Sequence, residues 1–552
     1  MKQLSIMKKV KKQRLSQLIG GCLATLMLVQ GFGTATLAAN TSPHQFSNQL
    51  DADIPIIVIP GIAGTEFRNP ANSVLELVWI NVLWHFQGHL EQMALDTNGL
   101  PIIGTVAPVS TGYGANNTYR TLLRDLRAAF GHDRVHFWGY DWRLDNAYNA
   151  LRLNDFIDSL NVPTVHIVAH SMGGLIASRY IADGHGHRIN TLITLGTPFL
   201  GSPRVPYIFA TGNLVEVPIL PGPRNGVRNV SSHMLSAYQM LPFESPYHYI
   251  GIGNRTGMLW WSGLEWRPVA NERNFIRDSL PMRGVEDSQV PASVRASFLN
   301  RAPHFIESTF MNGVHAVETV NSHIIIGNNI PTVHTTVFNA NNDFIETLSF
   351  TRGDGTVPVW SQTINGRVNT ISFNYDHTAL TNRPRVINHI IQLINGITPR
   401  MAGDVALDDP FVVISTTNRA DITVNYDEEM LSSVDGDLNT LTSFGTLHFI
   451  GPDEATKILA LTADSVHDVL ITATDFGTTD YTIRFYDYNF ELVEERGFLN
   501  VPISADMTIT TNTDQEEGTT LTLSSRRNRF FSITLQPDYI YNVEDGLILF
   551  DE

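Results

Sequence analysis

The sequence predicts an α/β protein with a mostly parallel sheet and helices on both faces, followed by a smaller all-β domain. Three observations support this prediction. Strand-like and helix-like segments alternate through residues 53–400, and short Val, Ile and Thr runs between Asp, Gly and Asn turns replace them afterwards. One serine also lies in a small-residue turn between a predicted strand and a predicted helix. Alternation is typical of a parallel sheet, and repeated short strands are typical of a sandwich.

The alternation can be followed along the chain. Apolar, β-branched runs predict buried strands, and apolar residues at helical spacing predict helices. The predicted strands cover residues 54–59, 135–140, 164–169, 189–195, 324–326 and 368–373, and the predicted helices cover residues 118–130, 153–160, 175–181 and 385–394.

Two long insertions interrupt this alternation, at about residues 62–115 and 199–320. Connections of this length inside a compact domain are usually lids or binding loops. Both insertions are rich in aromatic residues, namely Trp79, Trp84, Phe86, Trp260, Trp261 and Trp266. Any one of these rings can instead pack onto the sheet, but together they favour a mobile apolar cap over the serine.

The N-terminus predicts a signal peptide covering residues 1–39. Basic residues precede an apolar run at 18–29 that is too short to span a bilayer, and small residues then offer a cleavage site near Ala38 or Ala39. The single cysteine, Cys22, lies inside this segment; a lipoprotein cleavage site there is the weaker alternative. We therefore expect an exported, extracellular protein without thiol or disulfide, and without a cysteine nucleophile. No later segment is apolar enough to be transmembrane.

The charge is concentrated in the C-terminal part. Residues 401–552 contain 28 acidic and seven basic side chains, whereas the net charge of the whole chain is −17. An acidic region of this kind argues against nucleic acid as a partner. The segment 435–439 could hold calcium, but it lacks the remaining spacing of a ligand loop, so a plain acidic turn is preferred. We expect no metal and no cofactor. The predicted domains are thus a catalytic domain at 40–400 and an acidic β-sandwich-like accessory domain at 401–552.

The serine turn predicts the chemistry. A β-branched strand runs into Ala169–Gly174 (Ala-His-Ser-Met-Gly-Gly), and a helix follows. This is the nucleophile-elbow arrangement of an α/β-hydrolase, with alanine in the first glycine position. Small residues let strand and helix approach each other, which exposes the hydroxyl of Ser171. The alternative is an ordinary Ser-Gly turn at the end of a strand, without a catalytic role. His170 is expected to point away from Ser171 and to be structural.

A serine needs a histidine to take its proton and an acid to orient that histidine, in the chain order serine, acid, histidine. Asp354 lies in a glycine-flanked turn after a strand-like run, and His377 lies between the last predicted strand and the closing helix. For the oxyanion hole we expect backbone N–H groups of Met172, after the nucleophile, and Ile62, after the first strand.

Several motifs together resemble the lecithin:cholesterol acyltransferase-like family of acyltransferases, phospholipases A and related lipases. The similarity covers roughly residues 54–396, and its motifs are Pro60–Gly64, Tyr140–Leu144, Ala169–Gly174, Gly196–Pro198, Gly201–Pro203 and Gly353–Pro358. The resemblance implies an α/β-hydrolase with a lid that acts on lipid acyl esters through Ser171, Asp354 and His377. It would also place Trp142 near the acyl pocket. From the residues alone, Asp141 and Arg143 could equally form a buried structural pair.

The sequence therefore predicts a secreted serine esterase of the lipase or phospholipase A type, acting through an acyl-enzyme on a lipid or other ester substrate at a lipid interface. O-acyl transfer to an alcohol such as a sterol is the close alternative. A binding protein on an inert hydrolase scaffold is a further alternative. Acyl chain length, head group, oligomeric state and the role of the C-terminal domain are left open.

Overall fold

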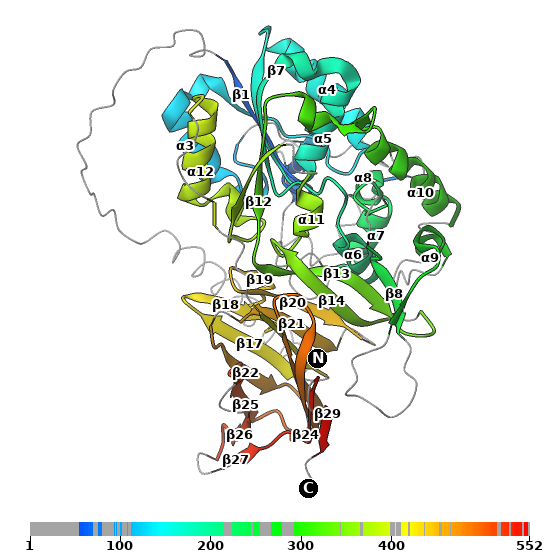
Figure 1. The fold of residues 1–552 in the computed structure, drawn as a ribbon, viewed down its shortest axis with the longest axis vertical. Coiled ribbons are helices and arrows are strands. Elements are labelled where there is room, and N and C mark those ends of the chain that lie inside the picture. Colours follow the sequence, from blue (N-terminus) through cyan, green and yellow to red (C-terminus); the bar gives the residue numbers. More distant parts are fainter. Residues whose placement is uncertain are drawn as a thin grey trace, which may run out of the picture. The chain divides into compact units, whose positions relative to one another are not determined.

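A six-stranded parallel sheet forms the centre of the first part of the chain, with strand order β15-β12-β7-β6-β1-β5 in the computed structural model (Figure 1). Its strands are β1 (Ile56–Ile59), β5 (Val135–Phe137), β6 (Val165–His170), β7 (Ile189–Leu195), β12 (Ser322–Gly327) and β15 (Asn369–Phe373). The structure describes residues 54–549 except 70–75, 80–92, 94, 97–99, 102–106, 109–111, 214–223, 244–246, 254–265, 279–291, 343, 365–367, 398–402, 405–409, 418–419, 435–436, 452–454, 464, 516–519, 529–530 and 544–545.

Helices cover both faces of this sheet because side chains alternate along each strand. Ile57 and Ile59 belong to one apolar cluster with α4 (Asn146–Ser159) and α5 (Met172–Tyr180). Ile56 and Val58 belong to another, with α3 (Arg120–Phe130) and α12 (Pro384–Ile394). The predicted α/β-hydrolase fold is therefore confirmed.

The second predicted insertion builds helices and part of a second sheet. The helices are α6 (Arg204–Thr211), α7 (Arg224–Ser232), α8 (Leu235–Tyr238), α9 (Glu272–Asp278) and α10 (Ala292–Glu307). The sheet has the order β14-β13-β8-β9 and consists of β8 (Ile250–Gly253), β9 (Trp266–Pro268), β13 (Ile330–Phe338) and β14 (Ile345–Gly353). The chain thus leaves the parallel sheet after β12, forms the antiparallel β13–β14 pair, passes through α11 (Val359–Gln362) and returns at β15.

Smaller elements complete this part. The first insertion contains β2 (Phe67–Asn69), β3 (Glu76–Trp79) and β4 (Ala107–Pro108), and a short hairpin joins β10 (Phe310–Met311) to β11 (Val314–His315). Trp84, Phe86, Trp260 and Trp261, on which the cap prediction partly depends, lie outside the described residues, as does the predicted signal peptide. Within the described part of the chain, no helix has both the length and the apolar character needed to cross a bilayer.

The C-terminal part consists of two antiparallel sheets, as the sequence predicts. The larger has β19 (Leu441–Thr442), β20 (Gly445–Ile450), β21 (Thr456–Thr462), β16 (Phe411–Thr416), β23 (Gly477–Tyr486), β24 (Leu492–Ile503), β28 (Tyr539–Asn542) and β29 (Gly546–Leu549), in that order. The smaller has β18 (Glu429–Ser432), β17 (Ala420–Tyr426), β22 (Asp468–Ala473), β25 (Met507–Asn512), β26 (Leu521–Ser525) and β27 (Ser532–Leu535). Buried residues of both sheets form one apolar cluster, as in a sandwich.

These sheets pack against the hydrolase part. Phe411 and Ile450 belong to the same apolar cluster as Phe338 and Ile345 of β13 and β14. The amide of Gly451 donates a hydrogen bond to the carbonyl of Ile345 at 2.9 Å.

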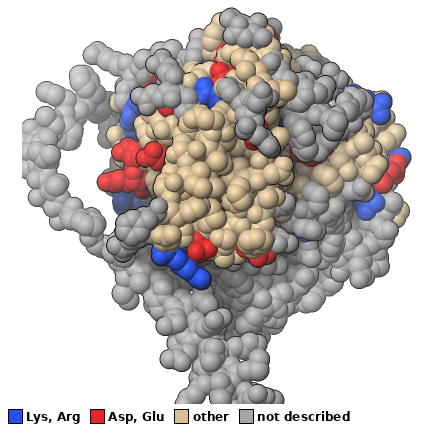
Figure 2. Space-filling model, turned by 90° about the horizontal axis from the view of Figure 1, so that it is seen from below, with Lys and Arg blue, Asp and Glu red and all other residues tan. Residues whose placement is uncertain are grey.

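Figure 2 shows the molecule from below: a broad tan area without charged residues is bordered by acidic and basic side chains in small groups. On this face the described acidic residues do not form one continuous patch.

Candidate active site

The serine turn has the backbone conformation of a nucleophile elbow. Ser171 joins β6 to α5 with φ 53° and ψ −128°, a conformation that L-residues rarely adopt. The adjacent glycines are needed for close packing. A Cβ on Gly173 would lie 2.7 Å from the carbonyl oxygens of Ile59 and Pro60, and one on Gly174 would lie 2.0 Å from Thr197 Oγ1. The small residues after Ser171 are thus needed because a larger side chain there would collide with neighbouring backbone and side-chain atoms.

Asp354 and His377 form a buried pair. His377 Nδ1 lies 2.7 Å from Asp354 Oδ2, and the two side chains are 1% and 0% exposed. The other carboxylate oxygen accepts hydrogen bonds from the amides of Thr356 (3.0 Å) and Val357 (2.7 Å). Because these bonds fix the carboxylate, Nδ1 of His377 is held as the donor, and Nε2 is then the basic nitrogen of the ring.

The serine and this pair lie at the same end of the sheet. The amide of Ser171 donates to the carbonyl of Leu195 at 2.8 Å, and Gly196 comes directly after that carbonyl. A Cβ on Gly196 would lie 2.9 Å from both Asp354 Oδ2 and His377 Nδ1. Gly196 has φ 57°, so this crowded position also requires a left-handed conformation. The structure therefore brings together residues that are about 180 to 200 positions apart in the sequence.

A second acidic residue stands next to His377 but has another role. Asp376 accepts hydrogen bonds from the amides of Thr378 (3.0 Å) and Ala379 (2.9 Å), which caps the short turn after His377. Burial raises the pKa of this carboxyl group. The structure thus distinguishes Asp354, which contacts the imidazole of His377, from Asp376, which only precedes His377 in the sequence.

The loop after β1 approaches Ser171 closely. A Cβ on Gly61 would lie 2.8 Å from Ser171 Cβ, so no larger residue fits there without movement. The Gly64 amide donates to the Gly61 carbonyl at 3.1 Å, and the Trp79 indole donates to the carbonyl of Ala63 at 2.7 Å. Ile62 lies inside this fixed loop, and Met172 is the first residue of α5. Both predicted oxyanion donors therefore flank the serine.

In the Tyr140–Leu144 motif, Trp142 lines a cavity, and Asp141 and Arg143 contact each other. The Trp142 indole donates to the carbonyl of Thr65 at 3.2 Å, and its ring lines the cavity beside Ser171. Asp141 and Arg143 also form the buried ion pair, with Oδ2 2.6 Å from Nη2. The sequence could not decide between these roles because they belong to adjacent residues and do not exclude each other.

A mostly apolar cavity of about 120 Å³ opens beside Ser171. Its walls come from the loop after β1, from β3, from the turn after Asp354 and above all from the insertion at 199–320. They comprise Ile62, Ala63, Trp79, Trp142, Ser171, Pro198, Ser202, Arg204, Val205, Ile208, Phe209, Val227, Val230, Ser231, Met234, Ala237, Met240, Thr356 and Val357. The insertion at 199–320 thus lines this cavity through α6, α7 and the residues around α8, and a mobile apolar cap stays a prediction.

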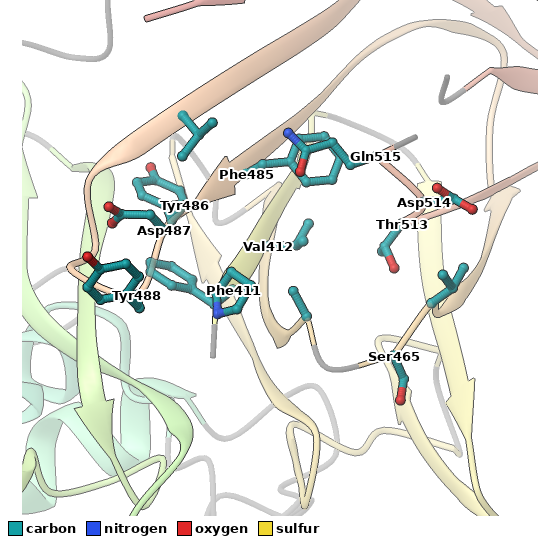
Figure 3. A pocket seen from close by; sticks show the side chains of 14 residues that line it. Phe411, Val412, Ser465, Phe485, Tyr486, Asp487, Tyr488, Thr513, Asp514 and Gln515 are labelled. Atoms are coloured by element: carbon teal, nitrogen blue, oxygen red, sulfur yellow. The ribbon is translucent and has the colours of Figure 1, made fainter. Parts of the chain in front are cut away.

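A second cavity, of about 540 Å³, lies among the C-terminal strands (Figure 3). Figure 3 shows aromatic side chains, including Phe411 and Tyr488, together with Asp487, Asp514 and Gln515 around it. Its lining contains none of Ser171, Asp354 and His377, whereas Ser171 itself lines the other cavity, and the two cavities share no residue. We therefore place the candidate active site in the smaller cavity. Among the described residues, no cluster of His, Cys, Asp and Glu has the arrangement of a metal site.

Comparison with known proteins bears on the part of the chain that contains the serine turn. Residues 111–280 match the lecithin:cholesterol acyltransferase family model. The family recognised from the motifs is therefore confirmed over this range, which contains the serine turn. At the level of reaction class, the chain is a serine hydrolase or an acyltransferase. No curated protein is similar enough in sequence to count as a relative.

Solved structures with similar folds are lipases, esterases and related proteins of low sequence identity. The structure of the Tle4–Tli4 complex has 14% identity and a TM-score of 0.43, and covers 63% of this chain and 99% of the other. The propeptide form of the Bacillus licheniformis lipase BlEst2 has 12% identity and a TM-score of 0.31, covering 90% and 96%. The lin2722 product of Listeria innocua has 14% identity and a TM-score of 0.24, covering 64% and 97%.

Proposed function

We propose that this protein is an exported serine esterase that hydrolyses lipid acyl esters, of the lipase or phospholipase A type. The observation that carries the proposal is the buried contact of 2.7 Å between His377 Nδ1 and Asp354 Oδ2 at the end of the sheet that presents Ser171. A histidine oriented in this way beside a strained serine turn is suited to acyl transfer.

In the proposed mechanism, Ser171 Oγ attacks the ester carbonyl carbon while Nε2 of His377 takes the hydroxyl proton. The oxyanion accepts hydrogen bonds from the N–H groups of Ile62 and Met172. The C–O bond to the alcohol then breaks, and His377 returns the proton to that alcohol. Water attacks the acyl-enzyme in the same way and releases the acid. Asp354 orients the ring through Nδ1 and stabilises the imidazolium.

The lining of the cavity supports an acyl chain as the bound group. Helices α6 and α7 contribute mainly Val, Ile and Phe side chains, the residues that flank α8 contribute Met234 and Met240, and Trp142 closes one side. Burying methylene groups against such side chains is favourable by about 0.8 kcal/mol for each group. We therefore place the acyl chain along Trp142 and α6.

O-acyl transfer is the second candidate, and the match of residues 111–280 to an acyltransferase family favours keeping it. Both reactions share the acyl-enzyme, and they differ only in whether water or an alcohol attacks it. A labelled phospholipid offered with and without a sterol acceptor separates them. A labelled steryl ester would favour transfer, and free fatty acid alone would favour hydrolysis.

The test of the proposed function is Ser171→Ala compared with Ser178→Ala. Ser178 lies on the same helix and donates to the carbonyl of Gly174 at 2.7 Å, behind the nucleophile. We expect Ser171→Ala to lower hydrolysis of short esters, triglyceride and phospholipid by about 10⁴-fold or more and to abolish labelling by a fluorophosphonate. Ser178→Ala should keep both. An unlabelled Ser171 in the native protein would instead favour a binding protein on an inert hydrolase scaffold.

A further inference from the structure

We propose that His170 and Tyr119 are positioning residues that hold the loop of Ile62 and the loop of His377 against the Ser171 turn. The proposal rests on the function proposed above, because it concerns the same nucleophile, oxyanion hole and histidine. Neither side chain lines the cavity beside Ser171, so neither is placed to contact the substrate.

The imidazole of His170 connects two segments that are far apart in sequence. Its Nδ1 lies 2.8 Å from the hydroxyl oxygen of Tyr119, and its Nε2 lies 3.1 Å from the carbonyl oxygen of His377. The rings of His170 and His377 also pack together, with centroids 4.6 Å apart. The residue before the nucleophile thus holds the backbone of the proposed general base.

The hydroxyl of Tyr119 extends this connection to the oxyanion loop. It accepts a hydrogen bond from the amide of Gly61 at 2.8 Å, and Gly61 directly precedes Ile62. Tyr119 is 1% exposed and stands just before α3, which is packed on the sheet. Because α3 is fixed, the hydroxyl provides a fixed anchor for the backbone whose next N–H is the proposed oxyanion donor.

Hydrogen-bonding rules assign the protons in this network. A carbonyl oxygen can only accept, so Nε2 of His170 carries the proton and donates to His377. Nδ1 is then an acceptor for the Tyr119 hydroxyl, whose oxygen in turn accepts from Gly61. Burial and the neighbouring His377 hold the pKa of His170 well below its usual range, so the neutral ring persists. Three segments that must meet around one substrate carbonyl are thereby connected through neutral, directed bonds.

Positioning by such a network has a measurable consequence. Oxyanion donors act only within about 2.7–3.1 Å of the oxygen, and a shift of about 1 Å far from the chemistry can reduce the rate about 100-fold. Loosening the loops should therefore lower kcat and leave KM little changed, because the acyl cavity itself is intact.

The first test is Tyr119→Phe, which removes the hydroxyl and keeps the ring. We expect kcat for a short p-nitrophenyl ester to fall about 10- to 100-fold, with KM within about twofold. The second-order rate of Ser171 labelling by a fluorophosphonate should fall in parallel, because the phosphonyl oxygen occupies the oxyanion hole. Labelling should still reach one equivalent.

The chain offers a matched control in Tyr207→Phe. The Tyr207 hydroxyl is also fully buried, accepts from a backbone amide (Phe449, 3.0 Å) and donates to a backbone carbonyl (Phe449, 3.3 Å). The two variants therefore lose similar bonds and should lose similar thermal stability. Only Tyr119→Phe should lose kcat and labelling rate when both are assayed well below their Tm values.

Substitutions of His170 test its two hydrogen bonds, to Tyr119 and to the His377 carbonyl, separately. They also provide the test if Tyr119→Phe does not fold. His170→Asn can still accept from Tyr119, His170→Gln can still donate to the His377 carbonyl, and His170→Leu can do neither. We expect His170→Leu to be the least active, with partial recovery in at least one of the other two.

Two results would overturn the proposal without touching the proposed function. One is native kcat and labelling rate in Tyr119→Phe together with full labelling of Ser171. The other is equal activity of the Leu, Asn and Gln variants at position 170. If Ser171 of the native protein is not labelled at all, the proposed function itself fails.

Discussion

Leu441, in the C-terminal sheets, packs against Gly355, the residue that follows Asp354. A Cβ on Gly355 would lie 2.6 Å from Leu441 Cδ1. Other contacts from these sheets reach the same region, since Thr446 Oγ1 donates to the carbonyl of Pro331 at 3.3 Å. Glu429 also lies 3.6 Å from Arg383, a few residues after His377. The C-terminal sheets therefore support the turns that carry both Asp354 and His377.

This contact predicts that Gly355→Ala impairs both stability and turnover. Gly355 has φ +86°, where an alanine costs roughly 1 kcal/mol, and its methyl group would press on Leu441. We expect a lower Tm, and a fall in kcat of about tenfold if the Asp354 turn, rather than the Leu441 side chain, moves to relieve the contact.

The double variant Gly355→Ala/Leu441→Ala separates the two causes. Removing the leucine side chain relieves the contact but not the backbone strain, so kcat should recover more than Tm. Native kcat in Gly355→Ala alone would mean that the C-terminal sheets do not constrain the acid turn.

The structure also predicts a large effect for Asp354→Asn. The amides of Thr356 and Val357 both require an acceptor, so the asparagine oxygen should face them and its NH₂ group should face His377. That orientation forces the proton of the imidazole onto Nε2, which can then no longer accept from Ser171. We expect kcat to fall about 10³- to 10⁴-fold with little change in fold.

Asp376→Asn is the matched control for this experiment. Asparagine can cap the turn at Thr378 and Ala379 as aspartate does, so activity should stay within a few-fold of the native value. If the two variants lose activity equally, Asp354 is not the residue that orients His377.

Local patterns explain why much of the site could be predicted from the sequence. The turn at Ser171 is determined by residues next to it, namely a β-branched strand and glycines that must clear Ile59 and Thr197. The fold class and the confirmed family follow from similarly local motifs. The strand positions in the parallel sheet also agree to within about three residues, because most of its buried strands are continuous apolar runs. The predicted helix at 153–160 covers only the second half of α4.

Long-range contacts explain what the sequence could not show. The strand before Asp354, β14, belongs to a separate mixed sheet. It forms an antiparallel hairpin with β13, and β13 pairs in parallel with β8, which lies much earlier in the chain. Tyr119 has no local signal, because a buried tyrosine at the start of an amphipathic helix indicates only a core position. Similarly, neither the sequence around Leu441 nor the sequence around Gly355 indicates by itself that these two residues pack together. The division into two domains at residue 400 stays a prediction.

Because several buried histidines have lowered pKa values, we predict that the protein loses stability in mild acid. Burial lowers the pKa of His315 to about 4, and His170 and His448 are also shifted well below their usual range. Well above pH 6.5 these rings are neutral in both folded and unfolded chains, so the free energy of unfolding does not depend on their titration. Between pH 6.5 and 4 the unfolded chain binds the proton and the folded chain does not. Stability must therefore fall across this range.

His315→Asn isolates one of these contributions. His315 is fully buried between the rings of Phe199 and Phe310, and its Nδ1 accepts from the amide of Val317 at 3.4 Å. Asparagine can keep that cap but does not titrate, so the loss of stability between pH 6.5 and 4 should shrink by up to about 3 kcal/mol. Urea unfolding at several pH values measures this slope. An unchanged slope in His315→Asn would show that His315 takes up its proton in the folded state.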